Sequence, residues 1–447
     1  MFIIIIEIMF KKKFLSVHLN EFNLNFLKYG AKKFNFRNIQ KILEFNIIKT
    51  YSIDKIQDKN LDPWVQTVTI NTGTSSKFHR VYKTGQTISK QLIQIWDKLS
   101  KNNIYCAVWG TMNTHFKDNK FIKIFFPDPW NKQIALKPKI LKKAFNLPRS
   151  FAQNYTDFNK LKNLKYITQF FLISIYYIKF SQLILILKLF FETFLLKGFK
   201  NYNLFFLFDL ISLCIFFNIL KKDDANFSHI FLNSLAHFQH NNWDEKNNHI
   251  IYFKYADALC KIILENYDKY DQILIYNGFS QKKIKPEFLL RPINPKKFLK
   301  KLGINFKKLN TNMTNGGILE FYNKNDLQLN KIKLKKFKIF GYKLFEIKTL
   351  SNNKIFFRIQ VKSSNKININ TSINSIKKYL SYDSNYKINF TKKSTLNENI
   401  FADMKFIKTT GKHYFEGNIL SKKKISNYKK IENKKIFSII ERFFLKN

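Results

Sequence analysis

The sequence predicts an α/β fold with a mostly parallel central sheet that is covered by helices on both faces. Three short apolar runs, Phe14–Leu19, Ile104–Val108 and Asp271–Tyr276, are typical of buried strands. Amphipathic segments such as Gln91–Leu99 and Tyr255–Tyr267 have the spacing of helices. Because helical and strand patterns alternate, and parallel strands need long crossover connections, this order indicates a parallel sheet between two helical layers.

The chain is expected to contain one large domain and one appendage. Residues 14–325 are predicted to form the α/β domain, in which Phe22–Leu43 forms a helix and Trp64–Thr72 a helix or strand. Residues 160–225 are predicted to be a helical insertion into this domain. Residues 326–447 alternate Lys with Ile, Leu and Phe, which predicts a small Lys-rich α+β appendage.

Two apolar stretches raise the question of a membrane. Phe170–Leu196 is interrupted by Lys179, Lys188 and Glu192, and Asn203–Leu220 contains Asp209. A membrane-spanning helix needs about 20 predominantly apolar residues with few charges. We therefore favour amphipathic helices of an insertion over membrane attachment.

The net charge is the most conspicuous feature of the composition. The 447 residues carry 78 basic and 30 acidic side chains, which gives a formal net charge of +48. Only six of the basic residues are Arg, the side chain that nucleic-acid sites favour for its two-pronged grip on phosphate and guanine. The excess of Lys, Asn, Ile and Phe is what an AT-rich coding sequence yields. The charge is therefore attributed to base composition, and a nucleic-acid partner is disfavoured.

The cysteines exclude a disulfide scaffold. Cys106, Cys214 and Cys260 are an odd number and lie far apart, without CxxC spacing. This usage fits a reducing compartment, so we expect a cytoplasmic protein.

Four polar and aromatic segments carry the candidate chemistry. They are Leu61–His79, Trp109–Asn113 with Phe126–Asn131, Asn233–Trp243 and Ile275–Gln281. Several follow predicted strands, and ligands of open α/β sheets bind at the carboxyl ends of strands. The residues predicted to contact substrate are Asn20, Trp109, Asn113, Trp130, Arg149 and Asn277.

Asp62 and Asp128 stand in the same Asp-Pro-Trp context. Two carboxylates displayed in this way suit a general acid–base pair or the binding of one cation. The alternative is structural, because Asp followed by Pro also begins helices as a cap and first-turn residue. Arg149 likewise suits either an anion clamp or the partner of a buried carboxylate.

His237 and His240 lie three residues apart and are expected on one face of a helix. Two imidazoles on one face can bind a metal ion, for which Asp244 or Glu245 would complete the ligand set. Purely structural roles for both histidines are the alternative.

The order of these landmarks resembles the alkaline-phosphatase-like superfamily, which contains type I phosphodiesterases, nucleotide pyrophosphatases and sulfatases. The resemblance extends over about residues 14–325. It rests on the opening strand, on Thr72-Gly73 followed by His79, on His237, and on a helix led by Asp257 before a last strand. It implies a phosphate- or sulfate-ester hydrolase with divalent metal ions.

Several positions depart from that family's pattern. Asn20 stands where the family carries a metal-binding Asp, and Asp62 falls where it carries a Ser or Thr nucleophile. Asn233 replaces another Asp, although His237 follows it, and Asn277 lies where two further ligands are expected. Because Asn keeps the shape of Asp without its charge, a two-metal mechanism is not expected, and any divalent-metal site is weakened.

A late family His falls near Met313–Gly316, where the sequence has none. The sequence therefore predicts a hydrolase or transferase of a phosphate or sulfate ester with a remodelled site, in which Asp62, Asp128 and His237 are catalytic. One alternative is a catalytically inactive protein that binds a phosphorylated or sugar ligand. A nucleic-acid-binding protein, argued from charge alone, is the third.

Overall fold

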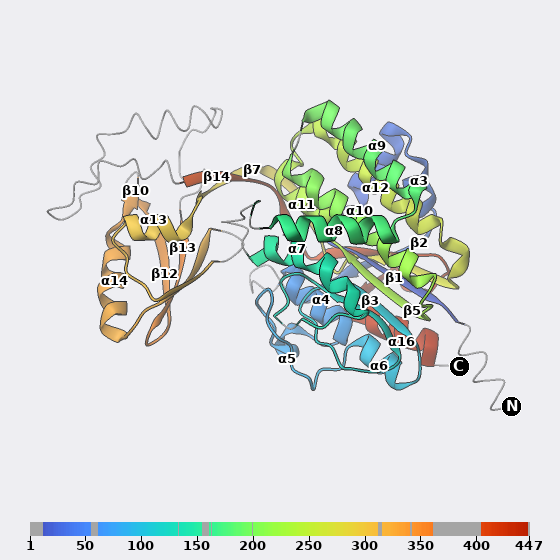
Figure 1. Ribbon diagram of the computed structural model, residues 1–447, viewed down its shortest axis with the longest axis horizontal. Coiled ribbons are helices and arrows are strands. Elements are labelled where there is room, and N and C mark those ends of the chain that lie inside the picture. Colours follow the sequence, from blue (N-terminus) through green and yellow to red (C-terminus); the bar gives the residue numbers. More distant parts are fainter. Residues whose placement is uncertain are drawn as a thin grey trace. The chain divides into compact units, whose positions relative to one another are not determined.

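The computed structural model describes residues 12–54, 61–132, 134–153, 161, 163–198, 200–311, 315–339, 342–360 and 404–445 (Figure 1). The chain divides into two compact units. The first comprises Met1–Lys283 and Gly411–Asn447, and the second comprises Ile284–Thr410. The division differs from the predicted boundary at residue 326 in two ways: the second unit begins at Ile284, and the last part of the chain returns to the first unit and joins its sheet.

An eight-stranded sheet forms the centre of the first unit, in the order β16-β2-β15-β6-β1-β5-β3-β4. The strands are β1 (Phe14–Leu19), β2 (Asn46–Tyr51), β3 (Cys106–Thr111), β4 (Ile122–Pro127), β5 (Phe227–Leu232), β6 (Gln272–Tyr276), β15 (Glu416–Ser421) and β16 (Lys430–Glu432). Strand β1 pairs in parallel with both β5 and β6, whereas β15 is antiparallel to β2 and β6. The predicted mostly parallel α/β sheet is confirmed.

Helices cover both faces of this sheet, and the side chains of each strand alternate between two cores. Along β6, Ile273 and Ile275 enter one core while Leu274 and Tyr276 enter the other. The first core is covered by α2 (Leu24–Phe34), α3 (Arg37–Leu43), α10 (Asn201–Leu220) and α12 (His249–Leu264). The second is covered by α4 (Pro63–Thr72), α6 (Ile95–Lys101) and α16 (Lys435–Leu445).

The helix predicted over Phe22–Leu43 is two helices. Asn35 ends α2 in the left-handed conformation, with φ of 55°, and its N–H donates to Ala31 O. Asn tolerates this conformation better than most residues, so the chain turns there and α3 begins at Arg37. Of the two alternatives for Trp64–Thr72, the structure shows a helix.

The predicted helical insertion contains α8 (Leu164–Tyr177), α9 (Phe180–Lys197) and α10, and α7 (Lys142–Gln153) precedes it. Within the described residues, one helix, Tyr202–Leu220, is long and apolar enough to cross a membrane. Its most apolar window is 72% buried inside the protein. Phe206, Leu210 and Leu213 are fully buried, so this helix serves as a core element of the first unit.

The second unit has its own sheet and core. Its four strands follow the antiparallel order β12-β13-β9-β8. The elements are β8 (Lys308–Thr311), β9 (Gly316–Glu320), β12 (Phe345–Ser351), β13 (Lys354–Ile359), α13 (Pro295–Lys301) and α14 (Lys324–Lys336). Strands β7 (Ser280–Pro292) and β14 (Met404–Tyr414) carry the chain out of the first unit and back into it.

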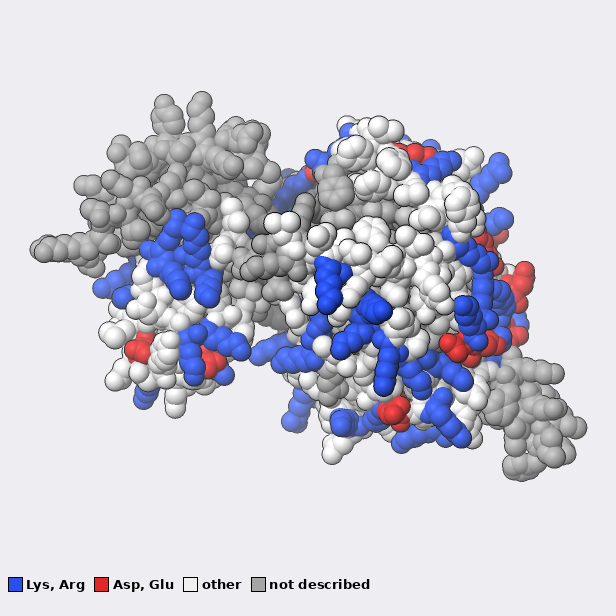
Figure 2. Space-filling model, in the orientation of Figure 1, with Lys and Arg blue, Asp and Glu red and all other residues white. Residues whose placement is uncertain are grey.

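Basic side chains are distributed over both units. Figure 2 shows Lys and Arg spread across the visible face, with acidic residues in small groups. The visible face carries no single basic stripe of the kind that tracks a nucleic-acid backbone.

Asn277, at the end of β6, ties three segments of the first unit together. Its Nδ2 donates to Phe22 O at 2.6 Å, and its Oδ1 accepts from Asn418 N at 2.6 Å. Its own carbonyl accepts from Thr50 Oγ1 at 3.3 Å. The substrate contact predicted for Asn277 is corrected, since both ends of its buried amide serve the backbone.

We predict that Asn277→Asp lowers the free energy of unfolding by about 1–3 kcal/mol, because a buried carboxylate cannot donate to Phe22 O. Urea unfolding at neutral pH measures the effect. Asn102→Asp is the matched control, since the exposed Asn102 amide also donates to a backbone carbonyl. Equal unfolding midpoints for the two variants would contradict the role given to Asn277.

Candidate functional site

Glu21 is the second residue after β1 and is the centre of the site. Its φ is 54°, in the left-handed region that long side chains rarely adopt, and its side chain is only 1% exposed. The neighbouring Asn20 donates from Nδ2 to Glu21 Oε1 at 3.0 Å and to Asn233 Oδ1 at 2.7 Å. An unusual backbone thus directs a carboxylate into the interior at the carboxyl end of a central parallel strand.

Two imidazoles and an amide surround the buried carboxylate of Glu21. Its Oε2 lies 3.0 Å from His240 Nε2 and 3.3 Å from His413 Nε2, and it accepts from Gln281 Nε2 at 2.6 Å. Burial alone raises the pKa of Glu21, but the charges and hydrogen bonds of His413 and His240 outweigh burial and hold the pKa well below its usual range. The carboxylate is therefore ionised at neutral pH.

His413 comes from β14, almost at the other end of the chain. Gly411 allows the close approach of this strand, because a Cβ there would lie 2.2 Å from Gln281 Oε1 and 2.6 Å from Gln239 O. Burial lowers the pKa of His413, but the Glu21 carboxylate raises it more, so the net pKa is above the ordinary value. Gln281 lies between these groups, because its Nε2 donates to Glu21 and its Oε1 lies beside Gly411 of β14.

Glu21 and His413 are functional residues that the sequence analysis did not name. A late His was sought near Met313–Gly316, of which the structure describes only Asn315 and Gly316. The available signal was weak: His413 is one of eight histidines in the chain and lies in a Lys-rich region without a recognisable motif.

Asp62 begins α4 at the N-cap position and faces His413. Its backbone carbonyl accepts from Val65 N and Gln66 N, but its side chain makes no capping hydrogen bond. Asp62 Oδ1 instead lies 3.7 Å from His413 Nδ1, and the side chain is 29% exposed. Burial raises the pKa of Asp62 to about 6. Asp62, Glu21, His240 and His413 are called the Glu21 cluster below.

His237 does not join His240 in this cluster. Both lie on α11 (Ser234–Asn242), but His237 Nε2 is 3.3 Å from Asn233 Nδ2, and its ring stacks on Phe205 with centroids 3.9 Å apart. Burial lowers the pKa of His237 to about 4, so the ring is neutral. The structure thus separates the two histidines that were predicted to share a metal.

The donor set of the Glu21 cluster fits one metal ion. One ligand atom each from Glu21, His240 and His413 lies within 4.8 Å of the others. Two imidazoles and a carboxylate suit a borderline divalent ion such as Zn²⁺. Asn20 Oδ1 is buried without a hydrogen-bond partner in the described part of the chain, which leaves an acceptor oxygen beside Glu21.

The described residues do not provide the second metal site that the resembled family implies. Asn20, Asn233 and Asn277 supply neutral amides where that family supplies carboxylates. The amide of Asn277 is fully engaged with Phe22 and Asn418. The residues therefore support one cation at most.

Asp128 lies apart from the Glu21 cluster. It follows the edge strand β4, and both β3 and β5 stand between β4 and β1. Its Oδ1 accepts from Trp130 N at 2.8 Å, and burial raises the pKa of Asp128 to about 7. Asp62 and Asp128 therefore do not form the predicted acid–base pair.

The remaining predicted substrate contacts have structural partners. Trp109 is buried and stacks on Phe126 at 4.1 Å between centroids, so its face is not available to a ligand. Arg149 Nη1 donates to Asn131 O at 2.6 Å. The half-buried Trp130 contributes its N–H to the Asp128 turn. These three residues build the core and the loop after β4.

Asn113 positions the beginning of α4. Its Nδ2 donates to Trp64 O at 3.1 Å and to Lys83 O at 2.8 Å. The Trp64 carbonyl is two residues from Asp62, so the loop after β3 sets the position of the helix that presents Asp62. Asn113 is therefore assigned a positioning role in place of the predicted substrate contact.

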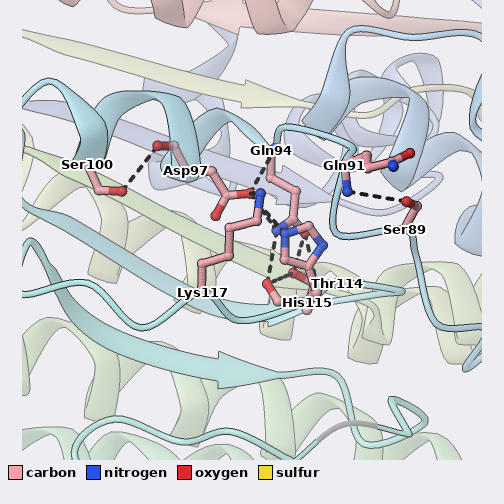
Figure 3. Close-up of polar contacts among 8 residues, drawn as sticks. All are labelled: Ser89, Gln91, Gln94, Asp97, Ser100, Thr114, His115 and Lys117. Carbon is pink, nitrogen blue, oxygen red and sulfur yellow. Dashed lines mark hydrogen bonds and ion pairs between the residues drawn. The ribbon is translucent and has the colours of Figure 1, made fainter.

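A second buried acid–imidazole pair holds that loop in place (Figure 3). His115 Nε2 lies 3.1 Å from Asp97 Oδ2, and Gln94 Nε2 donates to the same oxygen at 3.2 Å. Thr114 Oγ1 donates to Gln94 Oε1 at 2.6 Å. Burial raises the pKa of Asp97, but the hydrogen bond and charge of His115 outweigh burial and lower it. The pair anchors residues 114–115 to α6.

No protein-family model and no curated protein matches this chain. Among solved structures, murine ectonucleotide pyrophosphatase/phosphodiesterase 5 is 7% identical with a TM-score of 0.40, covering 97% of this chain and 95% of that chain. Phosphonoacetate hydrolase from Sinorhizobium meliloti 1021 is 9% identical with a TM-score of 0.40, covering 97% and 96%. Alkaline phosphatase from the Antarctic bacterium TAB5 is 10% identical with a TM-score of 0.37, covering 98% of both chains.

These three proteins belong to the alkaline-phosphatase-like superfamily, which is the one that the sequence landmarks resemble. Because the TM-scores and identities are low, the proposals for function rest on the residues of this chain.

We predict that Asp128→Asn stabilises the protein more at pH 8 than at pH 5. In the folded protein burial keeps Asp128 protonated up to about pH 7, whereas in the unfolded chain the carboxyl group ionises near pH 4. The free energy of unfolding of the wild type therefore falls as pH rises from about 4 to about 7. Asn does not ionise, so the stability difference between variant and wild type should grow by roughly 2–3 kcal/mol between the two pH values. Thermal or urea unfolding at both pH values measures it.

The exposed Asp118 provides the control, since Asp118→Asn should show no such pH dependence. An equal effect of Asp128→Asn at both pH values would show that burial does not raise the pKa of Asp128.

Proposed function

We propose that this chain hydrolyses or transfers the phosphate or sulfate group of a small-molecule ester at the Glu21 cluster. The observation that carries the proposal is the convergence of four segments at the carboxyl end of β1. The segments supply one buried carboxylate, two imidazoles and a second carboxyl group at the beginning of a helix. Their sequence positions run from Glu21 to His413, so local structure alone does not explain the grouping.

A single divalent ion on Glu21, His240 and His413 would supply the positive charge that an anionic ester needs and would polarise one of its oxygens. The ligand set leaves further coordination positions for substrate or water, as catalytic sites require. The side chains around Glu21 support this role, because the amides of Gln281 and Asn20 hold the carboxylate in place by hydrogen bonds.

Asp62 is proposed as the general base. It stands at the N-terminus of the ten-residue helix α4, where the helix dipole favours an anionic group. As the oxygen of water attacks phosphorus or sulfur, Asp62 accepts the water proton, and the bond to the leaving alcohol oxygen breaks. The alcohol oxygen takes up a proton from solvent. With a second alcohol in place of water, the same step transfers the group.

The alternative is a catalytically inactive protein that binds a phosphorylated or sugar ligand. Tryptophan faces suit sugar rings, but of the four tryptophans in the polar segments Trp109 and Trp243 are buried, and only Trp64 and Trp130 are half-buried. A neutral His237 held by Asn233 and Phe205 is better suited to shape the wall of the site than to transfer protons at neutral pH.

The proposal predicts that the purified chain contains about one equivalent of divalent metal and turns over an aryl phosphate monoester, phosphate diester or sulfate. Asp62→Asn should keep the metal and lower kcat by about 10²–10⁴-fold, because the base is lost. His413→Asn should lose the metal. Elemental analysis and a chromogenic substrate panel measure both properties.

Asp118→Asn serves as the control for the change of Asp to Asn at an exposed position and should retain wild-type turnover. Absence of turnover with every ester, in protein that is folded and metal-loaded, would contradict the enzymatic proposal. Full activity of Asp62→Asn would remove Asp62 from the mechanism.

A further inference from the structure

Helices α8 and α9 present large apolar side chains to solvent. Those that are exposed are Leu164, Phe171, Leu172, Ile175 and Tyr176 on α8, and Phe180, Ile184, Leu187, Phe191, Phe194, Leu195 and Leu196 on α9. Phe180 is 78% exposed and Leu195 is 82% exposed. These twelve residues are called the apolar hairpin surface. Large apolar side chains exposed in such number mark interaction sites on proteins.

The apolar hairpin surface is separate from the residues that hold the two helices to the protein. Phe170 and Ile173 of α8 are buried in the first core, as are Ile186 and Leu189 of α9. On α9 the exposed residues recur at helical spacing, through positions 180, 184, 187, 191 and 195, so they form a second stripe. Folding therefore does not require their apolar character.

The charges in this part of the sequence are mostly basic. Residues 164–200 contain the exposed lysines Lys165, Lys179, Lys188, Lys197 and Lys200. The same stretch contains a single acid, Glu192, which pairs with Lys254 and lies 3.9 Å from Lys188. Figure 2 shows a largely uncharged area over α8 and α9, with basic side chains and a small acidic group at its border.

We propose that the apolar hairpin surface docks the protein on an anionic lipid bilayer. A bilayer interface offers apolar chains to Phe, Leu and Ile, and anionic headgroups to the lysines at the border. Lysine stems lie along apolar surface while their ammonium groups reach the headgroups. A bilayer also needs no matching set of specific polar contacts, and the apolar hairpin surface offers few.

The helices are suited to lie in the interface and not to span the bilayer. α8 has 14 residues, and α9 has 18 with Lys188 and Glu192 inside. A spanning helix needs about 20 predominantly apolar residues. The one helix of sufficient length and hydropathy in the described residues, Tyr202–Leu220, is used in the protein core.

A second copy of this chain is a poorer occupant. A symmetric dimer places the same patch on both partners, so the lysines at the border would face the same lysines. Residues 164–200 carry five exposed lysines and only one acid, Glu192, so little negative charge offsets this repulsion.

Co-sedimentation of the full chain with vesicles tests the proposal. The protein should bind phosphatidylcholine vesicles that contain phosphatidylglycerol, and the bound fraction should fall with increasing salt and with removal of the anionic lipid. The double variant Phe180→Asp and Leu195→Asp should lower the partition coefficient by about tenfold or more, because it removes two inserted apolar groups. Both positions are exposed, so the unfolding temperature should not change.

Tyr428→Asp is the matched control, because Tyr428 is 74% exposed but lies far from α8 and α9 in the sequence, and it should bind like wild type. Equal binding of the double variant and wild type would attribute adsorption to net charge alone and overturn the proposal. Absence of binding to anionic vesicles would also overturn it. If the wild type does not bind vesicles but forms a dimer, and the double variant is monomeric, the surface is a dimer interface and the proposal is wrong.

Discussion

The burial of the Glu21 carboxylate is the constraint on which the site depends. An ionised carboxylate removed from water is costly unless charges and hydrogen-bond donors compensate it. Here the compensation comes from His240, His413, Gln281 and Asn20, which belong to four different parts of the chain. The fold must therefore bring α11, β14 and β7 to the end of β1, and the chain must return from its second unit to deliver His413.

The parallel strands explain how the residues that follow β1, β5 and β6 come together. Asn20, Asn233 and Asn277 follow the adjacent strands β1, β5 and β6, so their side chains emerge at one edge of the sheet. The Asn20 amide donates to Asn233 and Glu21, whereas the Asn277 amide holds the backbone of Phe22 and Asn418. Glu21 is the acid beside these neutral amides. Negative charge is thus concentrated on a single residue, which suits one cation and leaves Asp62 free for proton transfer.

Local patterns in the sequence predicted the sheet, its helical layers and the polar strand ends, because apolar runs and helical periodicity report burial directly. They also placed Asn20, Asp62 and His240 among the candidate residues. They could not predict His413, which is 392 positions from Glu21 (413 − 21) and depends on the path of the chain through the second unit. Trp109 was predicted to contact substrate because it follows the predicted strand Ile104–Val108, whereas it lies inside β3 and its ring stacks on Phe126 in the core.

A double-mutant cycle on Glu21→Gln and His413→Asn tests the central claim most directly. Free energies of unfolding are measured for wild type, both single variants and the double variant at neutral pH with a chelator present. The account predicts a coupling energy of about 1.5–3 kcal/mol, since either single change leaves a buried group without its partner. Additivity within about 0.5 kcal/mol would contradict the claim that these two residues compensate each other.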